Sequence, residues 1–270
     1  MTTSTLFARC AFLALLAIQP MIVSCQMIES ADPNEFRLNT TTVTEVFGYF
    51  AMRDLARAAA AGQVEKVAQL VKAGADPNGR GKEGITPLFW TFFARNAQGM
   101  QALLKAGANP NLPMHMTAKN GQWDEYLAVA AAQAEAVDVL KILLEHGASP
   151  ESVSNRDTPL TAGAACLECI KLLVRHGANV NRKNVADETV ATRAAAIGHY
   201  DAIIYLLENG YSVELDQLAW YVENRQGSDQ VRPKQDKILA MLVAKGIKPF
   251  VPEWQKKERE AQAAKEAPGR

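Results

Sequence analysis

The sequence carries no net charge, has few aromatic residues and lacks a long apolar segment. Its 29 Lys and Arg residues balance its 29 Asp and Glu residues, which argues against a basic nucleic-acid-binding face and against a polybasic membrane patch. The apolar run at residues 10–18 is too short for a membrane span, which needs roughly 20 apolar residues. Apolar residues nevertheless make up 48% of the chain, enough to bury a core.

The sequence also lacks the motifs that mark common catalytic sites. It contains no nucleophile elbow, P-loop, dinucleotide-binding fingerprint, zinc-protease motif or paired-carboxylate signature. We therefore expect a non-enzymatic protein with no catalytic residues, no bound metal and no cofactor. His115, flanked by two methionines, is the residue that most resembles a metal ligand, since thioether and imidazole groups suit copper. No second His or Cys lies at ligand spacing from it.

Residues 1–24 read as a targeting signal rather than as part of the fold. Arg9 supplies a small positive charge, the apolar run follows, and residues 22–25 spell Ile-Val-Ser-Cys. This stretch resembles the bacterial lipobox, which implies that Cys25 is lipidated and becomes the first residue of an exported protein. The alternative is an ordinary signal peptide with a chance cysteine, but no A-x-A cleavage site lies nearby. Gln26 favours anchoring to the outer membrane on its periplasmic side.

One phrase recurs six times in the rest of the chain. Its copies are LVKAGADPN (70–78), LLKAGANPN (103–111), LLEHGASPE (143–151), LLVRHGANV (172–180), LLENGYSVE (206–214) and the degenerate LVAKGIKPF (242–250). A Thr-Pro-Leu phrase precedes two of them by about twenty residues, at 86–88 and 158–160, and 189–191 is a weaker copy. The paired phrases resemble the ankyrin repeat over roughly residues 52–250.

The resemblance implies an all-α fold, an ankyrin-repeat solenoid of about six helix pairs with short β-turn hairpin tips. The residues suit it. Threonine caps a helix, proline fits the first turn, and glycine ends a helix in the left-handed conformation. Each pair exposes an apolar face that only a neighbour can cover, so stability comes from stacking. His146, His176 and His199 occupy positions where the repeat accepts a structural histidine.

The repeats divide the chain into segments. These are the signal peptide 1–24, a flexible tether 25–42, the repeat domain 43–250 and a charged tail 251–270. Within the domain we expect a capping unit 43–79, repeats 80–111, 112–151, 152–181 and 182–213, and a C-terminal cap 214–250. The third unit carries about seven extra residues, placed in 112–125. The fourth is short by about three, placed at the turn between its helices, and the last holds a polar insertion at 223–235.

Cys166 and Cys169 form a C-x-x-C motif at the shortened turn. A local disulfide is the preferred interpretation for an exported protein; free buried thiols and thioredoxin-like redox chemistry are the alternatives. Ideal helical i,i+3 geometry separates the two Cβ atoms by about 5–6 Å, too far for a bond, so a disulfide requires the turn to distort.

The family binds proteins through its tips and the outward face of its first helices. Transferred to this sequence, that pattern predicts the partner-binding residues Arg80, Lys82, Trp90, Phe93, His115, Trp123, Asn155, Arg156, Arg182, Lys183 and Arg193. Trp90 and Phe93 lie three residues apart on one helix side and would be exposed anchors. The alternative is that both fill core space.

These features favour a monomeric protein-binding module with a protein as its partner, contact with a membrane through the lipid anchor alone, and no nucleic acid. The most specific hypothesis is an immunity protein that neutralises a toxic secreted effector. A general periplasmic scaffold or protective binding protein is the alternative, and a metal handler or enzyme is the third.

Overall fold

The computed structural model describes residues 37–38, 41–48, 50–118, 121–225 and 229–248. The signal segment 1–24, Cys25, most of the tether and the tail 251–270 lie outside the described residues, so their predicted roles remain predictions. No helix in the described ranges is both long enough and apolar enough to cross a membrane.

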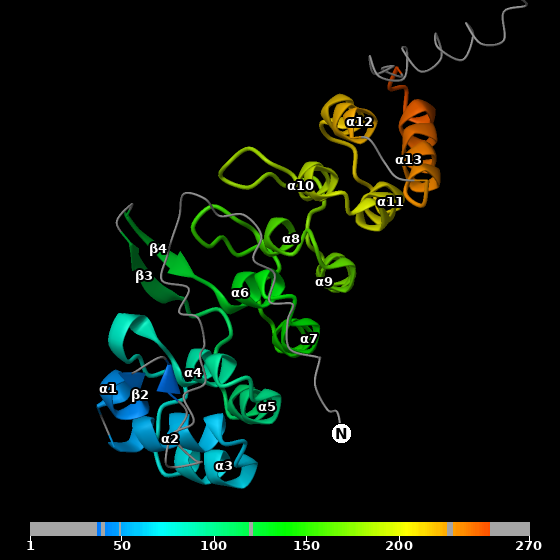
Figure 1. Cartoon of the computed structure of the whole chain (residues 1–270). Helices are drawn as coiled ribbons and strands as arrows, with labels where there is room; N and C mark the ends of the chain where they lie inside the picture. The colour runs from blue at the N-terminus through cyan, green and yellow to red at the C-terminus, as the bar shows by residue number, and fades with distance from the viewer. Residues whose placement is uncertain (1–36, 39–40, 49, 119–120, 226–228, 249–270) are drawn as a thin grey trace, which may run out of the picture.

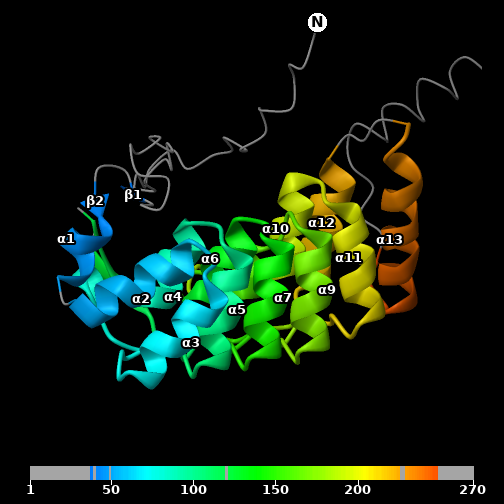
Figure 2. The ribbon, with the colours of Figure 1, turned by 90° about the horizontal axis from the view of Figure 1, so that it is seen from below.

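Six helix pairs stack side by side in chain order (Figure 1). They are α2 (Phe50–Ala60) with α3 (Val64–Lys72), α4 (Pro87–Phe93) with α5 (Ala97–Lys105), α6 (Leu127–Gln133) with α7 (Val137–Glu145), α8 (Pro159–Ala162) with α9 (Leu167–Arg175), α10 (Val190–Ile197) with α11 (Tyr200–Glu208), and α12 (Leu215–Asn224) with α13 (Arg232–Ala244). Figure 2 shows the second helices lying in a row. The predicted all-α solenoid of six pairs is confirmed.

The caps of the helices follow from the sequence phrases. The hydroxyls of Thr86, Thr158 and Thr189 each accept a hydrogen bond from the backbone N–H three residues on, at the start of α4, α8 and α10. The second helices end at glycines in the left-handed region, as at Gly147 with φ 83°. A side chain there would be strained, which is why the phrase repeats a glycine at this point.

A row of leucines forms the core between the units. Leu103, Leu143, Leu173 and Leu206, each four residues before a helix-ending glycine, are fully buried. Together with neighbouring alanines and leucines they join one continuous apolar cluster from Val43 to Leu242. Burial between successive units therefore stabilises the stack, as the repeat pattern predicted.

The N-terminal cap begins earlier than the sequence predicted. β1 (Arg37–Leu38) pairs antiparallel with β2 (Thr41–Thr42), and α1 (Val43–Phe47) follows. Thr42 and Glu45 form a capping box at the start of α1. The last residues of the supposed tether are thus part of the fold, and α1 covers the first unit with its buried face.

Asparagine side chains link each unit to the next on the side where the second helices end. The Asn78 amide donates to the Gly107 carbonyl (3.0 Å) and accepts from the Asn109 N–H (2.7 Å). Asn111 repeats both bonds with Gly147 and Ser149, and Asn181 repeats them with Gly210 and Ser212. We call each such link a rung.

One rung is made differently. Glu151 stands where the others have asparagine, and its carboxylate accepts from the Asn179 N–H (2.7 Å). A carboxylate cannot donate to the carbonyl that an amide would reach. Arg182 instead forms an ion pair with the Glu151 carboxylate and donates to the Glu151 carbonyl (2.7 Å). The departure at Glu151 is thus matched by a cation 31 residues later in the chain.

The extra residues of the third unit form a β-hairpin rather than an irregular loop. β3 (Met114–Ala118) pairs antiparallel with β4 (Gly121–Glu125), with Met116 opposite Trp123. In Figure 1 the hairpin stands between the loop before α4, which contains the short 3₁₀ helix η1 (Lys82–Gly84), and the loop before α8. The predicted position of the insertion, 112–125, therefore contains the whole hairpin.

The shortened unit loses residues from its first helix and not, as the sequence predicted, from the turn between its helices, because residues 163–166 separate α8 from α9 and only 94–96 separate α4 from α5. α8 is 4 residues long, against 7 in α4 and 8 in α10. The polar insertion predicted at 223–235 is also partly regular structure, because α12 runs to Asn224 and α13 starts at Arg232. Gln235 is buried there, and its amide donates to the hydroxyl of Tyr200 (3.0 Å) and the carbonyl of Arg225 (2.8 Å).

Candidate partner-binding surface

The predicted binding residues divide into three groups in the structure. Some are exposed or half-buried, one is fully buried, and three are engaged in ion pairs that connect neighbouring units. All come from the loops before the first helices, which we call the tips, or from the first helices themselves (Figure 1). The division decides which side chains are available to a partner.

Trp90 corrects the sequence prediction, because its side chain is 0% exposed. It lies under the N-terminal cap, with its ring 6.0 Å from the Phe47 ring in an edge-to-face arrangement. Phe93 is half-buried and packs beside Phe89 (6.2 Å) and Phe92 (5.8 Å). Trp90 is therefore a core residue, whereas part of Phe93 remains accessible.

Arg80 and His115 fasten the hairpin to the preceding tip. Arg80 donates to the Pro113 carbonyl (3.0 Å), and its Nη1 lies 3.3 Å from His115 Nε2. His115 Nδ1 lies 2.7 Å from Asp124 Oδ1 on the opposite strand. Since a guanidinium only donates, neutral His115 would accept at Nε2 and donate from Nδ1 to Asp124.

Gly84 completes this fastening. A Cβ atom added there would come within 2.9 Å of the His115 ring, and the φ of 71° also disfavours a side chain. The hairpin thus packs directly on the backbone of η1, while Lys82 beside it is exposed.

Trp123 lies at the inner face of the hairpin. Its side chain is half-buried, and its indole N–H donates to Glu125 Oε2 (3.2 Å). Burial raises the pKa of the Glu125 carboxyl, hydrogen bonds from Trp123 and Ser154 oppose that shift, and the charge of Asp157 adds to it. Within the described residues the other carboxyl oxygen, Oε1, is buried without a hydrogen-bond partner.

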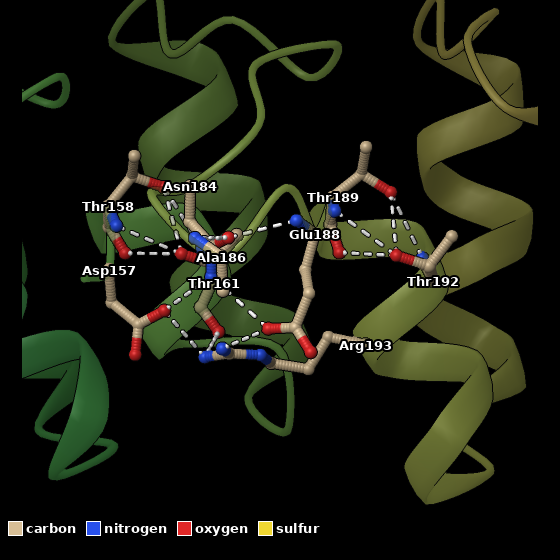
Figure 3. A network of polar contacts seen from close by, with 9 residues as sticks. All are labelled: Asp157, Thr158, Thr161, Asn184, Ala186, Glu188, Thr189, Thr192 and Arg193. Atoms are coloured by element: carbon tan, nitrogen blue, oxygen red, sulfur yellow. Dashed lines mark hydrogen bonds and ion pairs between the residues drawn. The ribbon is translucent and has the colours of Figure 1, made fainter.

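Arg193 joins two units rather than facing a partner (Figure 3). It contacts Asp157 (2.8 Å) and Glu188 (2.5 Å) and donates to the Thr161 carbonyl (3.2 Å). Burial alone would lower the pKa of its guanidinium, but the hydrogen bonds to the two carboxylates raise it. Arg182 serves the Glu151 rung, and Lys183 pairs with Asp187 (3.0 Å) and with Glu214. All three cations therefore have a structural role at the junctions between units, and the binding role predicted for them stays a prediction.

The same network shapes the tip before α10. The Asn184 amide donates to Asp157 (2.9 Å) and Glu188 (3.2 Å), and its oxygen accepts from the N–H groups of Ala186 and Glu188 (Figure 3). Asn184 is buried, so it is a structural residue whose bonds hold this tip against the preceding one.

The tip before α8 presents two predicted residues to solvent. Ser154 and Asp157 close a tight turn through mutual backbone hydrogen bonds (3.0 and 2.8 Å), and Asn155 and Arg156 at its apex are exposed. The Arg156 carbonyl accepts from the Val185 N–H (2.9 Å), which ties this tip to the next.

Among the described residues six large apolar side chains are exposed that the sequence analysis did not single out: Phe50, Val64, Val185, Ile197, Trp220 and Val243. Val185 on a tip is 65% exposed, Ile197 at the end of α10 is 49% exposed, and Trp220 on α12 is 52% exposed. The signal for Val185 was an apolar residue within the polar stretch 181–188. The signal for Ile197 was its position directly before Gly198, in the turn between two helices. The corresponding residues of three other units are alanines: Ala61, Ala94 and Ala134.

The structure joins Cys166 and Cys169 by a disulfide, with 5.2 Å between their Cα atoms. Cys166 is the N-cap of α9 and has an extended backbone (φ −111°, ψ 96°). Because Cys166 lies just outside α9, the pair does not have the ideal helical i,i+3 geometry that would keep the two Cβ atoms too far apart for a disulfide. Cys169 is fully buried.

The histidines have structural partners or stand apart from other ligands. His146 Nδ1 lies 2.8 Å from the Ile142 carbonyl, and His199 Nδ1 lies 2.9 Å from the Ala164 carbonyl of the preceding unit. In the part of the chain that the structure describes, no group of three His, Cys, Asp or Glu residues is arranged to hold a metal ion.

Comparison with known proteins agrees with this architecture. Residues 55–154 and 127–217 match the family model described as ankyrin repeats (3 copies), so the chain belongs to the ankyrin-repeat family. Cyclin-dependent kinase 4 inhibitor B of Bos taurus is 39% identical over 87 residues, which are 29% of this chain and 66% of that protein. The Mus musculus protein of the same name is 40% identical over 88 residues, 30% of this chain and 67% of that protein.

The chain thus spans about two thirds of the length of the curated relatives it matches. Those relatives are named as inhibitors of a kinase, and the family consists of binding proteins. The coarse class follows: the chain is a protein-binding module of ankyrin repeats.

Proposed function

We propose that this protein is an exported lipoprotein, anchored through Cys25, that binds another protein with its tips. The lipobox-like residues 22–25 support the anchor. The observation that carries the binding role is the contrast among the tips. Trp123, Asn155, Arg156 and Val185 on successive tips are exposed or half-exposed, whereas the cations beside them are occupied in ion pairs.

The partner in this proposal is a toxic effector that enters the periplasm, and the protein is its immunity protein. A surface-anchored binding module would meet such an effector where it acts. Aromatic and arginine side chains at tips suit this task, since they dominate binding energy at protein interfaces.

The anchor is tested by labelling cells with radioactive palmitate. Cys25→Ser should abolish the label and release the protein from the membrane fraction or leave the precursor uncleaved. Cys10→Ser, within the apolar run, is the matched control and should label like the wild type. Unchanged labelling of Cys25→Ser would rule out the lipoprotein.

The binding surface is tested by pull-down from periplasmic extract, with mass spectrometry to name the partner. Trp123→Ala and Arg156→Ala should each weaken binding at least tenfold, which corresponds to about 1.4 kcal/mol. Trp220→Ala on the last unit and Arg175→Ala at the end of α9, both exposed, are the matched controls. Equal capture by all four variants with intact helical circular dichroism would place the partner elsewhere.

The immunity role is tested by competition between cells. A strain that lacks the protein should be killed by wild-type neighbours that deliver the effector, and the wild-type gene should rescue it. Survival of the deletion strain in contact with wild-type cells would favour the general scaffold.

A further inference from the structure

The two strands of the hairpin have different surroundings. β3 lies beside η1, and its His115 is held by Arg80 at 3.3 Å. β4 pairs with β3 alone among the described strands. Its foot is tied to the next tip, where the Tyr126 N–H donates to the Ser154 hydroxyl (2.7 Å). Within β4 itself, residues 121–125, no comparable hydrogen bond to another tip is present in the described part of the chain.

The backbone of β4 therefore has an unpaired edge. Across the described residues, no N–H or C=O of residues 121–125 bonds to a group outside the hairpin. Alternate residues of an antiparallel edge strand direct both groups away from their partner strand. Proteins protect such an edge with short strands, charged side chains, proline or a bulge, and β4, with the sequence GQWDE, is short and acidic but has no lysine, proline or bulge.

The side chains beside this edge define what could pair with it. Trp123 lies opposite Met116, and these two form the apolar face of the hairpin. Gln122 and Asp124 lie on the other face and are exposed. Neither Asp124 nor Glu125 forms an ion pair with a Lys or Arg anywhere in the described ranges.

We infer that the edge of β4 receives an extended segment of the partner protein as a third strand, a mode of recognition in which backbone hydrogen bonds supply affinity and alternate side chains supply specificity. The segment alternates apolar residues, which lie beside Trp123, with basic residues, which lie beside Asp124. This inference rests on the proposed function and assigns to it a surface and a kind of ligand.

Two proline variants separate this edge from the rest of the hairpin. Gln122 on β4 and Thr117 on β3 are directly opposite, and in an antiparallel ladder both members of such a pair are either bonded to each other or directed outward. Gln122→Pro and Thr117→Pro therefore perturb the hairpin equally. They differ in which edge loses its N–H, so Thr117→Pro is the matched control.

The probe is a ten-residue peptide that alternates valine and lysine, with blocked ends and a fluorescent label, titrated into the purified full-length protein. Binding should slow hydrogen exchange of the backbone amides in residues 121–125. Gln122→Pro should weaken binding at least tenfold and Thr117→Pro less than twofold. The same peptide N-methylated at every residue should not bind, because it cannot donate to the edge in either strand orientation.

Absence of binding by the first peptide overturns the inference. Equal loss in both proline variants, or equal binding of the N-methylated peptide, also overturns it. A wild-type dimer in light scattering that Gln122→Pro dissolves would assign the edge to a second copy instead. If a pull-down partner binds Gln122→Pro like wild type, the inference fails while the proposed function stands. If the peptide binds the edge and no partner is captured, the edge stands without the proposed function.

Discussion

The units of residues 152–181 and 182–213 achieve the same packing with different residues. Both begin with a capping threonine and bury a leucine, Leu173 or Leu206, between repeats. The first of them has a first helix of 4 residues and the second one of 8. The shorter unit holds its second helix with a disulfide at the N-cap, whereas in the longer unit His199 bonds to the carbonyl of Ala164.

The hydrogen-bonded rungs that connect these two units to the units before them also differ. An asparagine amide reaches the unit of residues 182–213, and an acid with an arginine reaches the shorter one. The comparison indicates that the apolar layer is the common requirement of every junction. Covalent and ionic contacts replace neutral hydrogen bonds where a unit departs from the pattern.

Truncation of the shared layer should have the largest effect and should be equal in both units. Leu173→Ala and Leu206→Ala should each lower the free energy of unfolding by about 2–5 kcal/mol, since both side chains are fully buried. Urea titration followed by circular dichroism measures the loss. A loss below about 1 kcal/mol in one unit only would show that the two junctions are not equivalent.

Removal of the disulfide should have the next largest effect and should be confined to the shorter unit. In the chain-entropy model, closing so short a loop contributes about 2 kcal/mol. Cys166→Ser with Cys169→Ala, which keeps an N-cap oxygen, should lose up to that amount and become insensitive to reductant in the same titration. If the wild type is equally stable with and without reductant, the disulfide does not compensate for the shortened helix.

Arg182→Ala should cost less, about 1 kcal/mol, because both partners of the ion pair are partly exposed. The loss leaves the Glu151 carboxylate without its cation. Adding Glu151→Asn to the Arg182→Ala variant should restore stability, because the asparagine can rebuild the neutral rung. An asparagine rung requires no cation, so it should form without Arg182. A double variant no more stable than Arg182→Ala would contradict the substitution of one rung by the other.

The smallest effect concerns the acids that precede the first helices. Asp157 and Glu188 contact Arg193, but Glu125 has no such cation. Burial raises the pKa of Glu125, so the folded state holds this proton more tightly than the unfolded chain, whose value is near 4.5. The contribution of Glu125 to the free energy of unfolding is therefore complete below the unfolded pKa. It is lost as the pH rises through the pKa of Glu125 in the folded state.

Glu125→Gln should therefore be more stable than the wild type at pH 7, and the difference should disappear towards pH 4. Asp157→Asn is the control and should be less stable at pH 7, because it weakens the contact with Arg193. Thermal unfolding at several pH values measures both. A pH-independent difference for Glu125→Gln would show that this carboxyl does not titrate differently in the fold.

The sequence predicted those features that depend on short phrases. The glycine after each second helix and the threonine before three of the first helices, α4, α8 and α10, are local signals, and together they specify the stack. The hairpin was not predicted, because residues 112–125 match no repeated phrase, and the insertion was assigned only as a binding loop.

The roles of Trp90, Arg182 and Arg193 could not be predicted in this way. The segment FWTFFAR is aromatic on several sides, so helical periodicity does not identify the face that α1 covers. The two arginines act on Glu151 and Asp157, which lie about thirty residues earlier in the chain. Only the stacking of two units brings these charges together.

The asparagine rungs also affect how the protein ages chemically. Asn78-Gly79 is a sequence at which an asparagine side chain readily cyclises onto the next N–H and deamidates. In the fold the Gly79 N–H donates to the Asp76 carbonyl (3.2 Å), and the Asn78 amide is bound across the junction. Deamidation must therefore wait for this junction to open. The aspartate it leaves would lack the donor for the Gly107 carbonyl, so each opening that ends in this reaction weakens the junction that allowed it.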